Sequence, residues 1–179
     1  EISTRDWSSD VCSSDLKKMD PINQFLIERK DRISEYGLDD KFLALSREWL
    51  QQSMQRKYVY NFDWLGRPII QYPQDMIAMQ ELVWKLRPDV IIETGIAHGG
   101  SLVLSASLLA LLDISEAIEE GSTIDPRVSN RRVIGVDIDI RPHNRAAIEE
   151  HPMASRILMI EGSSVDPFIV EREIGRAHV

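Results

Sequence analysis

The segment from Glu93 to Ser101 carries the residues best suited to binding a ligand. It reads Glu-Thr-Gly-Ile-Ala-His-Gly-Gly-Ser and follows a short apolar run at 90–92. Glycines in such a turn let the backbone approach a ligand closely, because no Cβ intervenes. A carboxylate at the end of a strand repels a phosphate group, so Glu93 favours a ligand that carries positive charge.

Three classes of ligand compete for this turn. A dinucleotide-binding turn has the pattern G-x-G-x-x-G, which Gly95, Gly99 and Gly100 do not fit. A P-loop has the pattern G-x-x-x-x-G-K-[ST]; Gly95 and Gly100 have that spacing, but Ser101 stands where the lysine is required. S-adenosylmethionine has an ammonium and a sulfonium group and no phosphate, so it suits the acidic, lysine-free turn.

A second acidic residue, Asp137, ends another apolar run at 133–136. A carboxylate at this place can accept two hydrogen bonds from a ribose diol, which NAD and S-adenosylmethionine both have. Ser163 follows a third apolar run at 157–160, where a polar group would meet the adenine edge.

Each candidate also has a purely structural interpretation. Asp137 could cap a turn, Ser163 could be a helix N-cap, and Glu93 could accept a hydrogen bond within the turn. We interpret Asp139 as a solvated or helix-capping acid. His98 is ambiguous between a turn-forming role and a ligand contact.

The three apolar runs alternate with helical patterns at about 100–112 and 143–150, which predicts a parallel sheet of the α/β class. Ligands of such sheets bind at the carboxyl ends of the strands. Further helices are expected at 21–36, from residue 39 or 40 onward, and at about 73–86. The aromatic-rich stretch at 58–72 is expected to be a loop, in which Trp64 and Tyr72 either line a substrate cleft or pack inside.

The sequences at the two ends of the chain are not typical of a protein. Residues 6–16 can be back-translated to DNA ending in GCTCTTCCGATCT, and the end of the chain to its reverse complement, AGATCGGAAGAGC. We therefore expect residues 1–16 and 173–179 to be translated sequencing-adapter DNA, and genuine sequence from about Lys17 to Arg172.

Length and composition exclude several classes of protein. The 179 residues suit one α/β domain, and 43% hydrophobic residues argue against wholesale disorder. A net charge of −8 argues against a nucleic-acid partner. No apolar run reaches the ~18 residues of a membrane span, so no transmembrane segment is expected. The single cysteine fits a reducing compartment, and we expect a cytoplasmic protein.

Three segments resemble the cephalosporin hydroxylase / rhamnosyl O-methyltransferase family: 61–76 (NFDWLGRPIIQYPQDM), 91–102 (IIETGIAHGGSL) and 136–145 (VDIDIRPHNR). The resemblance covers roughly 58–167. It implies a class I S-adenosylmethionine-dependent O-methyltransferase with a Rossmann-like three-layer fold, here preceded by N-terminal helices and truncated after the third parallel strand. Family members often methylate a sugar hydroxyl of a glycolipid or polysaccharide, so the expected partner is a small-molecule or glycan acceptor, with a homo-oligomer possible.

The resemblance also implies a site. Glu93, Gly95, Gly99, Ser101 and Asp137 would hold the cofactor, and we add His98 and Ser163 from their positions after the strands. The family's Mg²⁺ is held after the fourth and fifth strands, so its ligands are expected downstream of this chain, and no catalytic residue is nominated. The expected organisation is an N-terminal helical segment at 17–57 and part of the cofactor-binding domain at 58–172. The alternatives are a non-catalytic cofactor-binding module and an NAD-dependent oxidoreductase.

Overall fold

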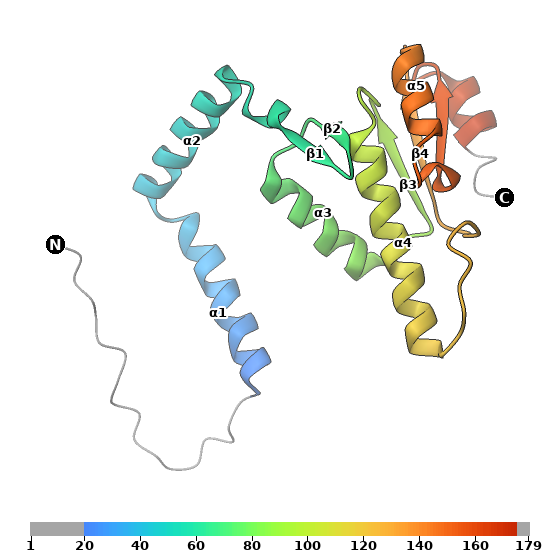
Figure 1. The fold of residues 1–179 in the computed structure, drawn as a ribbon. Helices are drawn as coiled ribbons and strands as arrows, with labels where there is room; N and C mark the ends of the chain where they lie inside the picture. Colours follow the sequence, from blue (N-terminus) through green and yellow to red (C-terminus); the bar gives the residue numbers. More distant parts are fainter. Residues whose placement is uncertain (1–19, 175–179) are drawn as a thin grey trace. The chain divides into compact units, whose positions relative to one another are not determined.

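The computed structural model describes residues 20–174 and divides the chain into two units, which meet between Gln52 and Ser53 (Figure 1). The predicted adapter segment 1–16 and most of the segment 173–179 lie outside the described residues. The two units are described separately below.

The N-terminal unit consists of helix α1 (Pro21–Tyr36) and most of helix α2 (Asp40–Gln55). Both helices begin where the sequence predicts, because an aspartate side chain precedes each one. Asp20 accepts a hydrogen bond from the backbone N–H of Asn23 at 3.3 Å, and Asp39 accepts one from Phe42 at 2.9 Å. These bonds satisfy amides that the first turn of a helix leaves without partners.

The second unit opens with a β-hairpin that the sequence does not reveal. A short 3₁₀ turn (Tyr58–Asn61) leads into β1 (Phe62–Trp64), which pairs antiparallel with β2 (Arg67–Ile69). The expectation of a loop at 58–72 is therefore wrong in part. The connecting residues Leu65 and Gly66 have φ angles of 47° and 81°, as a two-residue hairpin turn requires. Strands of three residues are too short to show a period-two pattern.

A parallel sheet forms the centre of this unit, as predicted. Its strands are β3 (Val90–Thr94), β4 (Arg132–Asp137) and β5 (Ile157–Glu161), in the order β3-β4-β5. Helix α3 (Pro73–Leu86) precedes β3, helix α4 (Gly100–Glu120) connects β3 to β4, and helix α5 (Pro142–Glu149) lies between β4 and β5. A π-helical segment (Ile169–Ile174) follows β5. The fold is Rossmann-like α/β.

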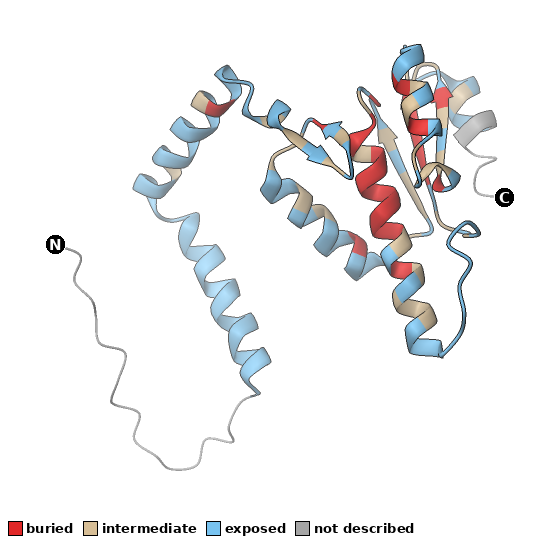
Figure 2. Cartoon of the chain, in the orientation of Figure 1, coloured by how far each residue is buried: buried red, intermediate tan, exposed pale blue. Residues whose placement is uncertain are grey.

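Helix α4 is the core helix of the unit (Figure 2). Its side chains from Leu102 to Leu109 are buried, and most of the apolar ones pack in one cluster with Ile69 of the hairpin, Val133 of β4 and Ile148 of α5. Among the described residues, α4 is the one helix long and apolar enough to cross a membrane. Half of its apolar 18-residue stretch is buried inside this fold. That burial accounts for its composition without a membrane.

Helix α4 continues two turns beyond its predicted end near Leu112. It stops at Gly121, whose positive φ of 65° is typical of a helix C-terminus. An ion-pair cluster stabilises the added turns: Asp113 binds Arg131 and Arg156, and Arg131 also binds Glu116 at 2.8 Å. Sequence patterns missed this extension because the charged residues after Leu112 resemble a polar loop.

Candidate functional site

The turn between β3 and α4 is held to the sheet by backbone hydrogen bonds. The N–H of Gly95 donates to the carbonyl of Val136 at 2.8 Å, and the N–H of Gly99 donates to Ile96 within the turn at 2.8 Å. The turn therefore lies across the carboxyl end of β4, which is where an open α/β sheet binds its ligands.

Two glycines of the turn allow neighbouring elements to approach. A Cβ on Gly99 would lie 2.4 Å from Cδ1 of Ile148 on α5, and the φ angle of 81° at Gly99 also favours glycine. A Cβ on Gly100 would lie 2.3 Å from the carbonyl oxygen of Pro68 on β2. The turn is thus packed tightly between α5 and the hairpin.

Asp137, at the end of β4, points into the turn. Its Oδ2 accepts a hydrogen bond from the N–H of Ile96 at 2.6 Å, and its Oδ1 accepts one from Asp139 at 3.2 Å. Partial burial raises the pKa of the Asp137 carboxyl, but backbone hydrogen bonds from Ile96 and its neighbours outweigh burial and leave the pKa lowered. Asp137 is therefore a negatively charged acceptor at neutral pH.

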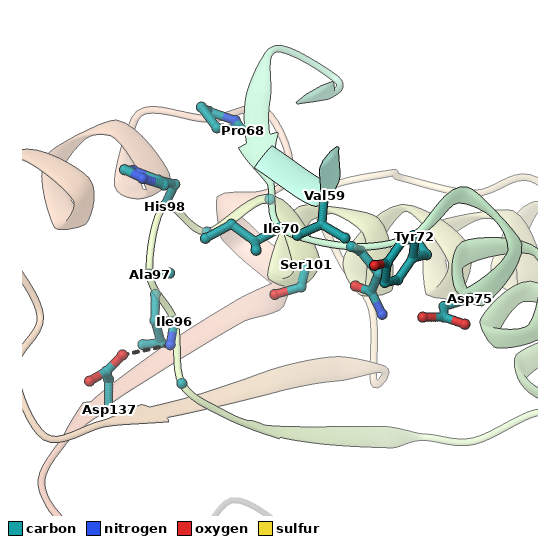
Figure 3. A pocket seen from close by; sticks show the side chains of 14 residues that line it. Val59, Pro68, Ile70, Tyr72, Asp75, Ile96, Ala97, His98, Ser101 and Asp137 are labelled. Atoms are coloured by element: carbon teal, nitrogen blue, oxygen red, sulfur yellow. Dashed lines mark hydrogen bonds between the residues drawn. The ribbon is translucent and has the colours of Figure 1, made fainter. Parts of the chain in front are cut away.

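A cavity of about 510 Å³ lies against this turn (Figure 3). Five of the seven residues proposed from the sequence line it together: Gly95, His98, Gly99, Ser101 and Asp137. Figure 3 shows Asp137 and Asp75 at opposite ends of the lining, with Ser101 between them. The described lining contains two carboxylates and one histidine, and no lysine or arginine.

The sequence of this chain also matches a known protein family. The profile of the family described as rhamnosyl O-methyltransferase/CmcI matches residues 56–178. The chain belongs to this family. No curated protein sequence matches it.

Three solved structures of CmcI are similar to the chain. The Mg-SAM form is 22% identical, covers 63% of the chain and has a TM-score of 0.44. The SAH form is 22% identical over 57% of the chain, with a TM-score of 0.37, and the apo form is 24% identical over 64%, with a TM-score of 0.40. The matched part is 40–43% of each CmcI chain, so this chain spans about two-fifths of the length of those family members.

Glu93 and Ser163 lie apart from the main cavity in this family member. Glu93 lines a neighbouring hollow of about 350 Å³, which shares Gly95 and Ser101 with the main cavity, and the Ser105 hydroxyl donates a hydrogen bond to its carboxylate. Ser163 is absent from the lining of both; its hydroxyl accepts a hydrogen bond from Val165 N–H at 3.4 Å. Glu93 thus has a hydrogen-bond partner on α4 and Ser163 has one in its own loop, and the cofactor contacts expected for both residues stay predictions.

The segment from the 3₁₀ turn through the hairpin to the start of α3 contributes lining residues that the sequence did not single out as a site. They are Val59, Pro68, Ile70, Gln71 and Asp75. Most of them fall within the family-like segment 61–76, which was the available signal. Tyr72 also lines the cavity, and its hydroxyl lies 2.8 Å from Oγ of Ser53. Trp64 instead packs inside, donating from Nε1 to Oγ of Ser107 at 3.0 Å.

The described residues offer no metal site. No group of three or more His, Cys, Asp or Glu side chains within 20–174 is arranged to hold a metal ion. Asp139 is exposed and lines a third hollow, of about 410 Å³, with Asp137 and Arg141. A pair of neighbouring acids alone does not supply the six oxygen ligands that Mg²⁺ prefers.

Proposed function

We propose that this chain is the cofactor-binding part of an S-adenosylmethionine-dependent O-methyltransferase. The observation that carries the proposal is the convergence of the Gly95–Ser101 turn and Asp137 on one cavity without a basic side chain other than His98. Membership of the rhamnosyl O-methyltransferase/CmcI family supports it. CmcI itself has a Mg-SAM form and an SAH form.

The residues present fit S-adenosylmethionine. We assign the ribose diol to Asp137, because an ionised carboxylate accepts two hydrogen bonds and its lowered pKa keeps it ionised. We assign the methionine end to the side of the cavity that holds Ser101 and Gly95, next to Glu93. In this assignment His98 contacts the bound cofactor, and Ser163 is the polar group on the adenine side.

The charges of the cavity favour this cofactor over a dinucleotide. NAD carries a pyrophosphate, which proteins bind with a glycine-rich turn of the G-x-G-x-x-G pattern. Here Asp137 and Asp75 both line the cavity, and the described lining has no lysine or arginine to offset a pyrophosphate. An NAD-dependent oxidoreductase is therefore the weaker candidate.

When bound, S-adenosylmethionine supplies an electrophilic methyl group on its sulfonium centre. In this proposal the residues of this chain bind and orient that cofactor. The described residues do not fit a metal, so we derive no step through Mg²⁺; we propose that Mg²⁺ is bound by segments outside them. The proposed acceptor of the whole protein is a sugar hydroxyl of a glycolipid, polysaccharide or related metabolite in the cytoplasm.

A non-catalytic binding module is the second candidate for the chain as given, because it spans about two-fifths of CmcI. Calorimetric titration with S-adenosylhomocysteine and with NAD separates the proposals. We expect S-adenosylhomocysteine to bind, NAD to give no heat, and no labelled methyl to reach a sugar or diol acceptor unless the remaining family segments are supplied. Binding of NAD in preference would overturn the proposal, and light scattering would report the oligomeric state.

A further inference from the structure

Two adjacent carbonyl groups of the cofactor turn are bound by side chains from opposite sides. Nδ2 of Asn144, on α5, donates to the carbonyl of Ala97 at 2.8 Å. Nε and Nη2 of Arg67, on β2, donate to the carbonyl of His98 at 3.0 and 2.6 Å. Nη2 of Arg67 also lies 3.4 Å from Oδ1 of Asn144, so the two side chains form one network, here called the Arg67–Asn144 clamp.

The clamp holds a backbone conformation that is unfavourable in itself. Ala97 has a φ of 46°, in the left-handed region that is unfavourable for residues with a Cβ. Such conformations persist only where the surrounding structure holds them. The clamp binds the carbonyl of Ala97 itself and that of the following residue, and Asn144 is only 4% exposed, so water cannot readily replace its bond.

The conformation of Ala97 in turn sets the geometry of the cavity. Ile96 directly precedes Ala97, and its N–H binds Asp137 at 2.6 Å. Arg67 and Asn144 do not line the main cavity, whereas the turn that lies between them does. Asn144 also lines the third hollow, with Ala97, His98 and Asp137, whereas Arg67 lines none of the hollows described above. The clamp can therefore influence a ligand in the main cavity through the turn.

We propose that Arg67 and Asn144 are positioning residues for cofactor binding, which hold Ala97 in its left-handed conformation and so align the turn amides with Asp137. The inference rests on the proposed function, because it assumes that the turn binds S-adenosylmethionine. It also predicts a property of the free protein, the slow hydrogen exchange of the turn amides, that requires no ligand.

The test compares four proteins: the unsubstituted chain, Asn144→Ala, Asn144→Ala with Ala97→Gly, and Ser107→Ala. Ser107→Ala is the matched control, because it removes a partly buried hydrogen bond between the same hairpin and α4 without touching the turn. Thermal unfolding establishes that each is folded. Hydrogen exchange of residues 94–101 and titration with S-adenosylhomocysteine are then measured.

We expect Asn144→Ala to accelerate exchange of the turn amides and to weaken S-adenosylhomocysteine binding by about tenfold, the effect of one buried hydrogen bond. Adding Ala97→Gly should recover about threefold of the affinity, since glycine adopts a positive φ without a steric penalty. Ser107→Ala should change exchange at 94–101 and affinity by less than about twofold, because its bond lies outside the turn. Equal effects of Asn144→Ala and Ser107→Ala on exchange and affinity would overturn the inference. A failure of Ala97→Gly to recover affinity in the Asn144→Ala background would also overturn it.

The outcomes also separate this inference from the proposed function. If the unsubstituted chain binds S-adenosylhomocysteine but Asn144→Ala binds equally well, the inference fails and the proposed function stands. If the unsubstituted chain is folded and does not bind, the proposed function fails, and the positioning role fails with it. If Asn144→Ala does not fold, Arg67→Met, which keeps most of the aliphatic stem, is measured in its place against the same expectations.

Discussion

The carboxylate of Asp137 accepts a hydrogen bond from the backbone N–H of Ile96 at 2.6 Å, although 41 residues separate the two in the sequence. The bond joins the end of β4 to the turn after β3. Each side fixes the other, because the amide orients the carboxylate and the carboxylate satisfies the amide. The geometry of the cavity therefore depends on both the end of β4 and the turn after β3.

Replacing Asp137 with asparagine tests the assigned ribose contact. The amide keeps the size of the side chain but loses its charge and part of its capacity to accept hydrogen bonds, so we expect Asp137→Asn to weaken S-adenosylhomocysteine binding by about ten- to a hundredfold. Isothermal titration calorimetry measures the change. The control is Asp139→Asn, at an exposed neighbour, for which we expect less than about a threefold loss. Equal losses would show that the contact is not specific to Asp137.

Glu93 should matter less for affinity than Asp137. Its carboxylate accepts a hydrogen bond from Ser105 and faces the neighbouring hollow. We expect Glu93→Gln to weaken S-adenosylhomocysteine binding by less than about tenfold, since the amide oxygen can still accept from Ser105. Calorimetry of Glu93→Gln and Asp137→Asn shows which carboxylate contributes more to S-adenosylhomocysteine affinity. A larger loss of affinity for Glu93→Gln would reverse our assignment.

A side chain at Gly99 should disturb both stability and binding. Gly99→Ala adds a Cβ that collides with Ile148 at a positive φ, whereas Gly121→Ala meets nothing within 4 Å at a similar φ of 65°. We expect about 1 kcal/mol of destabilisation for Gly121→Ala from the backbone alone, and about 1–3 kcal/mol more for Gly99→Ala from overpacking. Denaturant unfolding measures both, and Ile148→Ala should relieve only the additional part.

The buried ion-pair cluster should make stability depend on pH. Burial raises the pKa of the Asp113 carboxyl, but hydrogen bonds from Ser129, Arg131 and Arg156 outweigh it and lower the pKa overall. The stabilisation is therefore complete above the ordinary pKa of aspartate, about 4, and is lost as the pH falls below that value through the lowered native pKa.

Asp113→Asn should accordingly lower the free energy of unfolding by about 3 kcal/mol at pH 7 and by less near pH 3, where part of the stabilisation from the ionised carboxylate is lost. The matched control is Asp125→Asn, which breaks an exposed pair with Arg127 and should have a far smaller effect. Urea unfolding at both pH values measures these differences. A loss for Asp113→Asn that is the same at both pH values would contradict the assignment.

Much of the fold could be predicted from local patterns. The strands β3, β4 and β5 are short apolar runs that contain Val or Ile and lie between polar turns, and Asp20 and Pro21 mark the start of α1. The shared cavity of the Gly95–Ser101 turn and Asp137 also followed, because parallel strands bring their carboxyl ends to one edge.

The contacts that complete the site could not be predicted in this way. Arg67 and Asn144 lie 77 residues apart and meet only because the hairpin and α5 pack on the same turn. The hairpin itself has three-residue strands and an unusual Leu65-Gly66 turn, which give little local signal. Helix α4 was predicted too short because its last turns depend on partners such as Arg131, which belongs to a later segment.

The close packing of Pro68 on Gly100 indicates how small a piece of this protein can be and still contain the whole proposed site. A shortened chain starting at Gln71 would retain all three strands of the parallel sheet, yet it would lack the guanidinium that holds His98 and the backbone that covers the first turn of α4. The hairpin is therefore part of the proposed cofactor-binding unit, and domain boundaries drawn from the sheet alone would cut through it.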